Sequence, residues 1–368
     1  MAGGINPAGH VFLLYTSRMK KEETQHATLY RAYRPQDFGE VRGQEHIVET
    51  LERSIKNGKI AHAYLFSGGR GTGKTSVARI LAKALGVSDK DLYEIDAASN
   101  RGIDDIRALR EGVYAMPFNS PYKFYIIDEA HMLTKEAWNA LLKTLEEPPR
   151  HAIFVLATTE RDKVPDTIQS RCEVYSFRQP TREILAEIIT DVAKSEGYSL
   201  ESAGSELIAL LAEGSFRDGL SILQKVLSVA QGKKISVEDV ELVSGAPRGE
   251  IVRTILSAIA KKDVTNALAG LQSAVSENMD ARVLAKLLIQ RLRVVLLLRF
   301  APDLAKELSS ELTEADLTLA REIAHEKGIS SETLRTLLEA HGRMAYAVVP
   351  HLPLELAIID ICKTAASE

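Results

Sequence analysis

Short apolar runs alternate with amphipathic stretches between Ala61 and Phe177. Five of the runs predict strands, namely "AYLFSG", "LYEIDAA", "KFYIIDEA", "AIFVLATT" and "EVYSF". Three stretches carry apolar residues at helical spacing and predict helices, namely "SVARILAKAL", "GIDDIRALREGVYAM" and "TKEAWNALLKTLEE". The almost continuous apolar character of "KFYIIDEA" is typical of a strand buried on both faces of a parallel sheet. The alternation therefore predicts a three-layer α/β domain built on a five-stranded parallel sheet.

The strand pattern stops after "RQPT", near residue 180, and only helical periodicity follows. We expect the α/β domain over 29–179, a small helical domain over 180–245 and an all-helical domain over 246–368. The last two are joined by the Gly/Pro-bearing stretch "SGAPRGE". Residues 1–28 are expected to form a disordered tail, with Met19 as a candidate alternative start, because the apolar run 11–15 is too short for a signal peptide.

The most apolar internal segment is "VLAKLLIQRLRVVLLLRF". Four basic residues interrupt it, and a membrane span would need about 20 mostly uncharged residues. We therefore expect a buried helix here and no membrane partner.

Composition narrows the class of protein. The chain has 368 residues, of which 26% are charged and 45% hydrophobic, as is ordinary for a soluble globular protein. The formal net charge is −4, so any binding to nucleic acid must use a local basic surface. Two cysteines, Cys172 and Cys362, cannot build a disulfide framework or a four-ligand zinc site, which favours a reducing, cytoplasmic setting.

The stretch "GGRGTGKT", Gly68 to Thr75, fits the phosphate-binding pattern G-x-x-x-x-G-K-[ST] between a strand and a helix. Backbone N–H groups of such a loop surround phosphates at the positive end of the helix. Lys74 is expected to neutralise the β- and γ-phosphates of ATP, and the Thr75 hydroxyl to ligate Mg²⁺. A chance glycine turn is the alternative, and the strand–loop–helix context disfavours it.

Polar residues at the ends of two other strands complete a candidate hydrolytic site. Asp128 is expected to hold Mg²⁺ through its water shell, and Glu129 to polarise the water that attacks the γ-phosphate. An acidic helix cap is the alternative for this pair. A hydroxyl of Thr158 or Thr159 could contact the γ-phosphate or the water, although β-propensity alone explains both threonines. His131 fits a packing or capping role better than a ligand role.

The stretch "TIQSRCEVYSF" sets Arg171 beside Cys172, and neither residue has an obvious partner nearby in the sequence. No further thiol or histidine lies close by for zinc, and no base is identifiable for a nucleophilic thiol, so Cys172 is interpreted as a small, partly buried residue. Arg171 could reach outward to the γ-phosphate bound by another subunit, or it could form an ordinary surface ion pair. Sequence spacing alone does not decide between them.

Together these motifs resemble the AAA+ ATPases, and within them the bacterial clamp-loader gamma/tau subunits of DNA polymerase III. The similarity runs from about Leu29 to the C-terminus and is strongest through Arg178. It includes "YRAYRPQDFGEVRGQEHIVETL", "IDAASNRGIDDIR", "YIIDEAHMLTKEAWNALLKTLEEPP", "QSRCEVYSFR" and "EGSFRDGLSILQ". The resemblance implies that Arg171 acts in trans and that Arg217 senses the γ-phosphate. It also implies nucleotide contacts for Arg34, Pro35, Val41, Gly68, Gly69, Arg70, Gly71, Thr72, Gly73, Lys74, Thr75 and Ser76.

The resemblance further implies a pentameric ring closed by a collar over 246–368, with delta, delta-prime or copies of this chain as the other subunits. Such rings load the sliding clamp onto primer–template DNA, in the cytoplasm and in association with the nucleoid. Two departures matter. "AKALGVSDKDLYEIDAA" lacks the four-cysteine module usual in the family, so no zinc is expected. The chain also ends at Glu368, before the helicase- and polymerase-binding segments of longer forms, so those activities are not expected.

DNA contact is the least specific signal. Three arginines in "SNRGIDDIRALR" are offset by acidic residues, which favours a solvated mixed-charge face on residues alone. The resemblance places this segment against template phosphates and makes Arg101 the candidate contact. The rival functions are another DNA-directed AAA+ motor, which would need a winged helix that 246–368 does not suggest, and a nucleotide-gated scaffold with little turnover.

Overall fold

The computed structural model describes residues 28–100, 102–303, 312–326 and 328–363. The predicted tail over 1–28 therefore lies, apart from Thr28, outside the described residues. The chain folds into two compact units. Unit 1 takes in residues up to Leu185 together with Ala212–Ser221, and unit 2 takes in Ala186–Leu211 and the chain from Ile222 onward. The predicted boundaries near 180 and 245 stay predictions.

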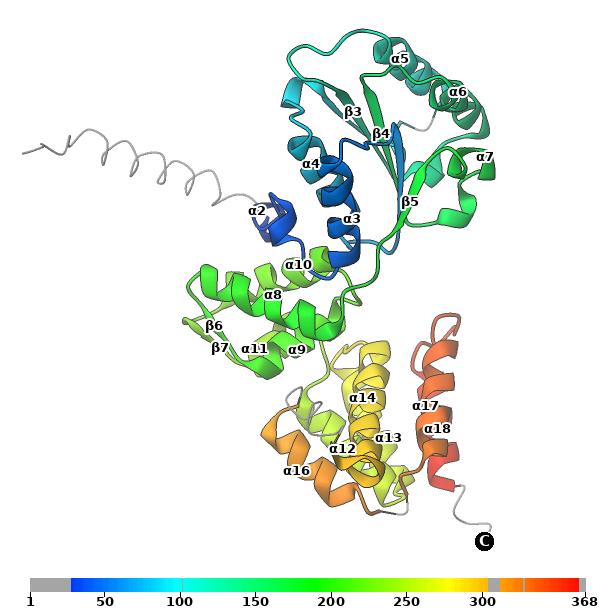
Figure 1. The fold of residues 1–368 in the computed structure, drawn as a ribbon. Coiled ribbons are helices and arrows are strands. Elements are labelled where there is room, and N and C mark those ends of the chain that lie inside the picture. The colour runs from blue at the N-terminus through cyan, green and yellow to red at the C-terminus, as the bar shows by residue number, and fades with distance from the viewer. Residues whose placement is uncertain (1–27, 101, 304–311, 327, 364–368) are drawn as a thin grey trace, which may run out of the picture. The chain divides into compact units, whose positions relative to one another are not determined.

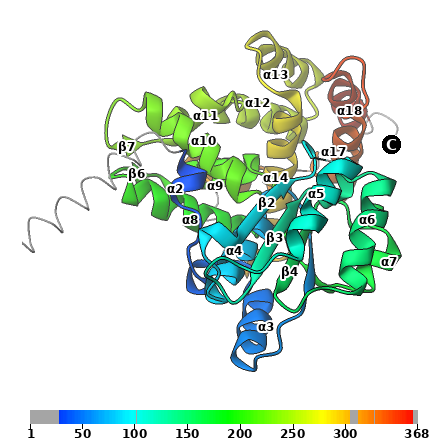
Figure 2. The same ribbon diagram turned by 90° about the horizontal axis from the view of Figure 1, so that it is seen from above.

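Unit 1 is built on a parallel five-stranded sheet in the order β2-β3-β4-β1-β5. Figures 1 and 2 show this sheet with its helices in two views. The five predicted strands are all present, and each ends within two residues of its predicted end. Their bounds are β1 Ala63–Ser67, β2 Leu92–Asp96, β3 Lys123–Asp128, β4 Ala152–Thr158 and β5 Glu173–Ser176. The order sets β3, β4 and β1 side by side, so their carboxyl ends share one edge of the sheet.

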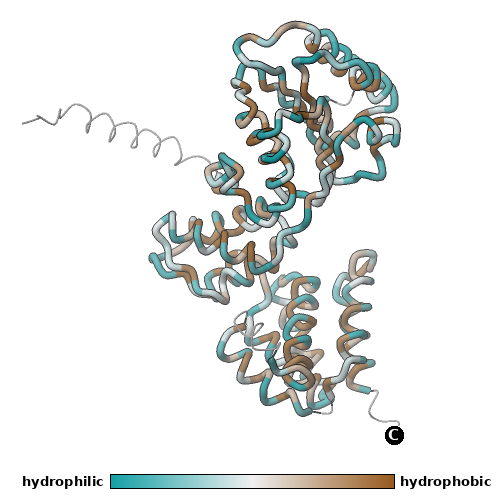
Figure 3. The backbone as a smooth tube through the Cα atoms, in the orientation of Figure 1, coloured by the Kyte–Doolittle hydropathy of each residue, from teal (hydrophilic) through white to brown (hydrophobic). Residues whose placement is uncertain are grey.

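Helices cover both faces of this sheet. One apolar core packs alternate strand residues such as Leu65 and Ile127 against α5 (Ile103–Val113) and α6 (Lys135–Glu146). The second core packs the intervening residues, such as Phe66 and Ile126, against α3 (Glu45–Lys56) and α4 (Lys74–Ala84). Figure 3 shows the strands as largely hydrophobic and the helices as mixed along their length. These two cores make the three layers that the apolar runs predict.

Shorter elements complete unit 1. They are α2 (Leu29–Ala32), α7 (Asp166–Gln169) and four 3₁₀ turns, η1 (Phe38–Glu40), η2 (Asp89–Asp91), η3 (Ala130–Met132) and η4 (Arg161–Lys163). Helix α6 begins where the sequence predicts, because the Thr134 side chain accepts a hydrogen bond from the Ala137 N–H as its N-cap.

Unit 2 is almost entirely helical. It comprises α9 (Ser202–Leu211), α11 (Val237–Ser244), α12 (Gly249–Ala260), α13 (Val264–Ser276), α14 (Ala281–Phe300), α16 (Glu314–Ile323), α17 (Ser331–Arg343) and α18 (Leu352–Lys363). Helices α8 (Arg182–Ser195) and α10 (Phe216–Val229) each have residues in both units. A two-residue parallel pair, β6 (Ser199–Leu200) with β7 (Lys234–Ile235), is an addition to the purely helical expectation. Two residues are too short to leave a periodic signal.

The apolar segment 283–300 lies in α14, as predicted. Its Arg291 is buried and forms an ion pair with Asp316 at 2.9 Å. Over the residues that the structure describes, none of the helices combines the length and apolarity that a membrane crossing requires.

Candidate nucleotide-binding site

The loop Gly68–Gly73 joins β1 to α4 and uses three glycines with positive φ. A Cβ on Gly71, where φ is +70°, would lie 2.0 Å from Ser215 Oγ. A Cβ on Gly68 would lie 2.5 Å from the Phe177 carbonyl oxygen. At Gly73, where φ is +101°, nothing lies within 4 Å of an added Cβ, so the space that a side chain would enter there is open. Each glycine is needed for a positive-φ backbone, and the open space suits a phosphate cradle.

Lys74 is the first residue of α4, and only 7% of it is exposed. Its Nζ donates to the carbonyl oxygens of Gly68 and Gly69, each at 2.8 Å. Burial lowers the pKa of this amine, and the nearby carboxylates of Glu129 and Asp128 oppose that shift. The amine is therefore held over the loop by weak carbonyl partners, which a more strongly charged phosphate oxygen can replace.

Thr75 and Asp128 meet across the end of the sheet. The Thr75 hydroxyl donates to Asp128 Oδ2 at 2.8 Å, and the Glu129 N–H donates to Asp128 Oδ1 at 3.0 Å. A hydroxyl and a carboxylate are hard oxygen donors, and Mg²⁺ combines a few such protein ligands with retained waters. Across the described parts of the chain, no group of three or more His, Cys, Asp or Glu residues could hold a metal ion by itself. Thr75 and Asp128 are too few to hold Mg²⁺ by themselves. They fit Mg²⁺ when phosphate and water oxygens complete its coordination.

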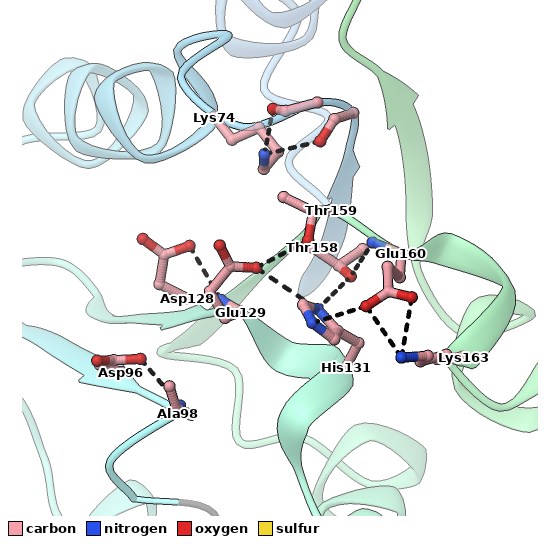
Figure 4. A network of polar contacts seen from close by, with 12 residues as sticks. Lys74, Asp96, Ala98, Asp128, Glu129, His131, Thr158, Thr159, Glu160 and Lys163 are labelled. Carbon is pink, nitrogen blue, oxygen red and sulfur yellow. Dashed lines mark hydrogen bonds and ion pairs between the residues drawn. The ribbon is translucent and has the colours of Figure 1, made fainter. Parts of the chain in front are cut away.

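Glu129 sits just past β3 in a left-handed conformation, with φ +47°. Its Oε2 accepts a hydrogen bond from the Thr159 hydroxyl at 3.2 Å and lies 3.5 Å from His131 Nδ1. The same Nδ1 lies 3.1 Å from the Thr158 hydroxyl at the end of β4. Figure 4 shows these side chains converging beside Asp128 and Lys74. The acidic pair and both threonines thus meet at one edge of the sheet.

The residues expected near the adenine lie in the segment 30–44. Arg34, Pro35 and Val41 are all half-buried. Burial lowers the pKa of the Arg34 guanidinium, and repulsion from Arg79 lowers it further. Gln44, which closes the "VRGQ" element of this segment, ties the segment to the phosphate loop and to the end of β5. Its amide exchanges hydrogen bonds with the Arg178 backbone at 2.7 and 3.1 Å and reaches the Thr72 carbonyl at 3.5 Å.

The start of α10 approaches the phosphate loop. The Phe216 N–H donates to the Gly71 carbonyl at 3.1 Å, and Ser215 is buried against Gly71. Arg217 is exposed, and its guanidinium stacks 4.9 Å from the centre of the Tyr30 ring. Of the remaining loop residues, Thr72 is buried, Gly69 and Ser76 are half-buried and Arg70 is exposed.

Arg171 follows α7 and has a partner within its own chain. Its Nη2 lies 2.7 Å from Glu146 Oε1, and its Nη1 donates to the Thr167 carbonyl at 2.6 Å. This ion pair is one of the two alternatives that the sequence leaves open, and it forms because α6 ends beside α7 and brings Glu146 to Arg171. Both side chains stay accessible, at 34% for Arg171 and 44% for Glu146.

Cys172 packs against the core under α5 and α6, and burial raises the pKa of its thiol to about 12. It is therefore a neutral packing residue at pH 7, as interpreted from the sequence. Arg101, the candidate DNA contact, lies outside the described residues.

His131 is more closely tied to the site than its sequence context indicates. Only 7% of its side chain is exposed, and both ring nitrogens face polar groups of the site. One feature of the sequence could have identified His131: it stands three residues after Asp128, the last carboxylate of the buried strand β3. This position places it on the η3 turn that follows Glu129.

A parallel sheet in this order, with the phosphate loop after β1 and the acidic pair after β3, defines a P-loop AAA+ fold. Comparison with solved structures agrees. The Thermotoga maritima RuvB Holliday junction branch migration motor superposes with a TM-score of 0.50 at 24% identity, over 62% of this chain and 79% of that one.

Sequence comparison gives the family. Residues 43–94 and 87–181 match the family model described as DNA polymerase III, delta subunit, and residues 235–367 match the one described as DNA polymerase III subunits gamma and tau domain III. The DNA polymerase III subunit gamma of Buchnera aphidicola is 36% identical over 65% of this chain and 70% of its own length. The DNA polymerase III subunit tau of Bacillus subtilis is 39% identical over 91% of this chain and 63% of its own length. The chain belongs to the DNA polymerase III gamma/tau family. It spans less than two thirds of the Bacillus subtilis relative and 54% of the subunit tau of Escherichia coli, which is 33% identical.

Proposed function

We propose that the chain is an ATPase subunit of a bacterial DNA polymerase III clamp loader. In this role it uses ATP binding and hydrolysis to load the sliding clamp onto primer–template DNA. The observation that carries the proposal is the meeting of Lys74, the Thr75–Asp128 pair and Glu129 at the carboxyl ends of β1 and β3, the two parallel strands that flank β4. Family membership supports the biological setting.

Each residue has a role that follows from its chemistry. The loop from Gly68 to Ser76 holds the phosphates, and Lys74 neutralises the β- and γ-oxygens. Glu129 polarises the attacking water, and Thr158 contacts the γ-phosphate or that water. Arg217 senses the γ-phosphate from the lid side, while Arg34, Pro35 and Val41 border the adenine.

Magnesium would be held by Thr75 and, through water, by Asp128, and when bound it neutralises charge on the β- and γ-phosphate oxygens. The Thr75–Asp128 hydrogen bond of 2.8 Å holds both oxygens together. The chain's own contribution is to position these two oxygens.

The partners proposed are the other clamp-loader subunits, delta, delta-prime or copies of this chain, in a pentameric ring within the cytoplasm. Arg171 serves the ATP of the neighbouring subunit in that ring, as an arginine finger does in trans. Arg101 contacts template phosphates, and that contact is salt-sensitive and independent of sequence.

The test is steady-state ATP turnover by the complete assembly, with primed DNA and the sliding clamp added separately and together. We expect stimulation by both, and loss of turnover in a matched assembly carrying Lys74→Ala. ATP binding without turnover under all conditions would instead favour the nucleotide-gated scaffold. Stimulation by DNA without any effect of the clamp would favour another DNA-directed AAA+ motor.

A further inference from the structure

His131 lies beside the proposed hydrolytic residues, and the proposed function assigns it no role. It lies on the η3 turn directly after Glu129, and its ring contacts Thr158 at the end of β4. Three polar side chains surround the ring, those of Thr158, Glu129 and Glu160, at 3.1, 3.5 and 3.3 Å. A side chain that is 7% exposed and has polar neighbours on both sides is constrained to one orientation.

Each ring nitrogen has its own polar partners. Nε2 lies 3.3 Å from Glu160 Oε1, which can only accept as a carboxylate. Thr158 Oγ1 accepts the Glu160 N–H at 3.0 Å and forms a second hydrogen bond with His131 Nδ1 at 3.1 Å. The Thr158 hydroxyl is therefore held between the Glu160 backbone and the His131 ring.

Glu160 is itself held in place. Lys163 Nζ lies 2.9 Å from Glu160 Oε2, and both residues belong to the short segment that follows β4. The chain of contacts therefore runs from Lys163 through Glu160 and His131 to Thr158, with the Glu129 carboxylate against the same ring nitrogen (Figure 4). Moving the ring would release the Thr158 hydroxyl and open space beside Glu129 at once.

We propose that His131 is a positioning residue for ATP hydrolysis, which fixes the hydroxyl of Thr158 and confines the carboxylate of Glu129. The inference rests on the proposed hydrolytic function of Glu129. His131 makes no contact with nucleotide in this scheme. It acts by holding the Thr158 hydroxyl and the Glu129 carboxylate in the positions from which they face the γ-phosphate and the attacking water. Misplacement of such groups by about 1 Å lowers the reaction rate by about 100-fold.

Three substitutions separate this role from simple packing. His131→Leu keeps the bulk and removes both ring nitrogens. His131→Asn places an amide where Nδ1 stands and so keeps the contact with Thr158, whereas His131→Gln extends an amide toward Glu160 and loses the Thr158 contact. We expect kcat of the DNA- and clamp-stimulated assembly to fall about 10- to 100-fold for His131→Leu and His131→Gln. His131→Asn should retain kcat within about fivefold, and KM and nucleotide affinity should be unchanged in all three.

His151→Leu is the matched control. His151 is also partly buried, and its Nε2 bonds the Val113 carbonyl at 2.9 Å, so a general effect of losing a histidine would appear there too. Unchanged kcat in His131→Leu, or rescue by Gln in place of Asn, would overturn the inference. If His131→Leu fails to fold, the Asn and Gln variants still decide it. Glu129→Gln separates the two proposals, because wild-type turnover in that variant would refute the hydrolytic role itself.

Discussion

At the scale of single residues, the phosphate loop depends on what lies behind each glycine. Gly71 faces Ser215, the residue that begins the approach of α10, at a distance that leaves no room for a methyl group. Gly73 also has a positive φ, but its missing side chain would point into open space. Gly71 is therefore required both by packing and by its backbone conformation, and Gly73 by its backbone conformation alone.

This difference gives a prediction for Gly71→Ala. We expect it to lower the free energy of unfolding by about 1–3 kcal/mol, because the backbone is strained and the new Cβ overlaps Ser215 Oγ. Adding Ser215→Gly should recover part of the loss, as measured by urea unfolding in a double-mutant cycle. Gly73→Ala is the control, since Ser215→Gly should not rescue it. Equal rescue of both variants would show that the contact with Ser215 is not the cause.

The residues of the candidate hydrolytic site are easier to predict from the sequence than the residues that surround and position them. Lys74, Thr75, Asp128 and Glu129 could be predicted because a short local pattern fixes each one relative to a strand end. The contacts that His131 and Gln44 make could not be predicted. Their partners Glu160 and Arg178 are far away in sequence, and only the closing of the sheet brings them together.

At the scale of elements, the loop after α5 is fastened by one buried carboxylate. Asp91, which is 0% exposed, accepts hydrogen bonds from the N–H groups of Phe118, Asn119 and Ser120 at 2.7, 3.1 and 3.1 Å. Burial by itself would raise the pKa of this carboxyl. The hydrogen bonds outweigh burial and lower the pKa to about 2.

The pKa shift predicts a pH-dependent contribution to stability. Because the folded-state pKa is depressed, the contribution is fully present above the unfolded value of about 4 and is lost as pH falls toward about 2. Asp91→Asn should therefore be destabilised by about 1–3 kcal/mol at pH 7, since an amide offers a weaker acceptor to three buried donors. The gap between variant and wild type, measured by urea unfolding, should narrow from pH 4 downward.

Asp89→Asn provides the matched control on the same 3₁₀ turn, because Asp89 is exposed there. It should change stability by less than about 0.5 kcal/mol. A gap for Asp91→Asn that stays constant down to about pH 2.5 would contradict the assigned cause.

The elements themselves were largely predictable, and for a physical reason. Strands buried on both faces and amphipathic helices leave different periodicities, so the five strands, α4, α5 and α6 could be placed from sequence. The 3₁₀ turns and the two-residue pair of β6 and β7 were not, because elements this short carry no period. The spatial order of the strands also required the structure, since each connection allows more than one position in the sheet.

At the scale of the whole molecule, Arg171 is the residue that is proposed to act on the nucleotide of a neighbouring subunit. Its pairing with Glu146 does not argue against action in trans. The pair is exposed, and such ion pairs contribute about 0–1 kcal/mol, so a triphosphate of far higher charge density can take the guanidinium from it. Within a single chain Arg171 follows α7 and points to the end of α6, whereas Lys74 and Glu129 lie at the carboxyl ends of the strands.

The trans role predicts a specific pattern of complementation. Arg171→Ala should bind ATP as the wild type does but lose stimulated turnover by about 10³-fold or more, because transition-state charge on the neighbour's γ-phosphate is no longer compensated. Mixed with Lys74→Ala subunits, which retain the arginine but not a working site, it should recover part of the turnover. Recovery follows because some interfaces then pair an intact site with an intact arginine.

Arg335→Ala, which also removes an arginine paired with a glutamate of its own chain, should leave turnover unchanged. Full activity of the pure Arg171→Ala assembly would remove the argument that one subunit completes the nucleotide site of the next.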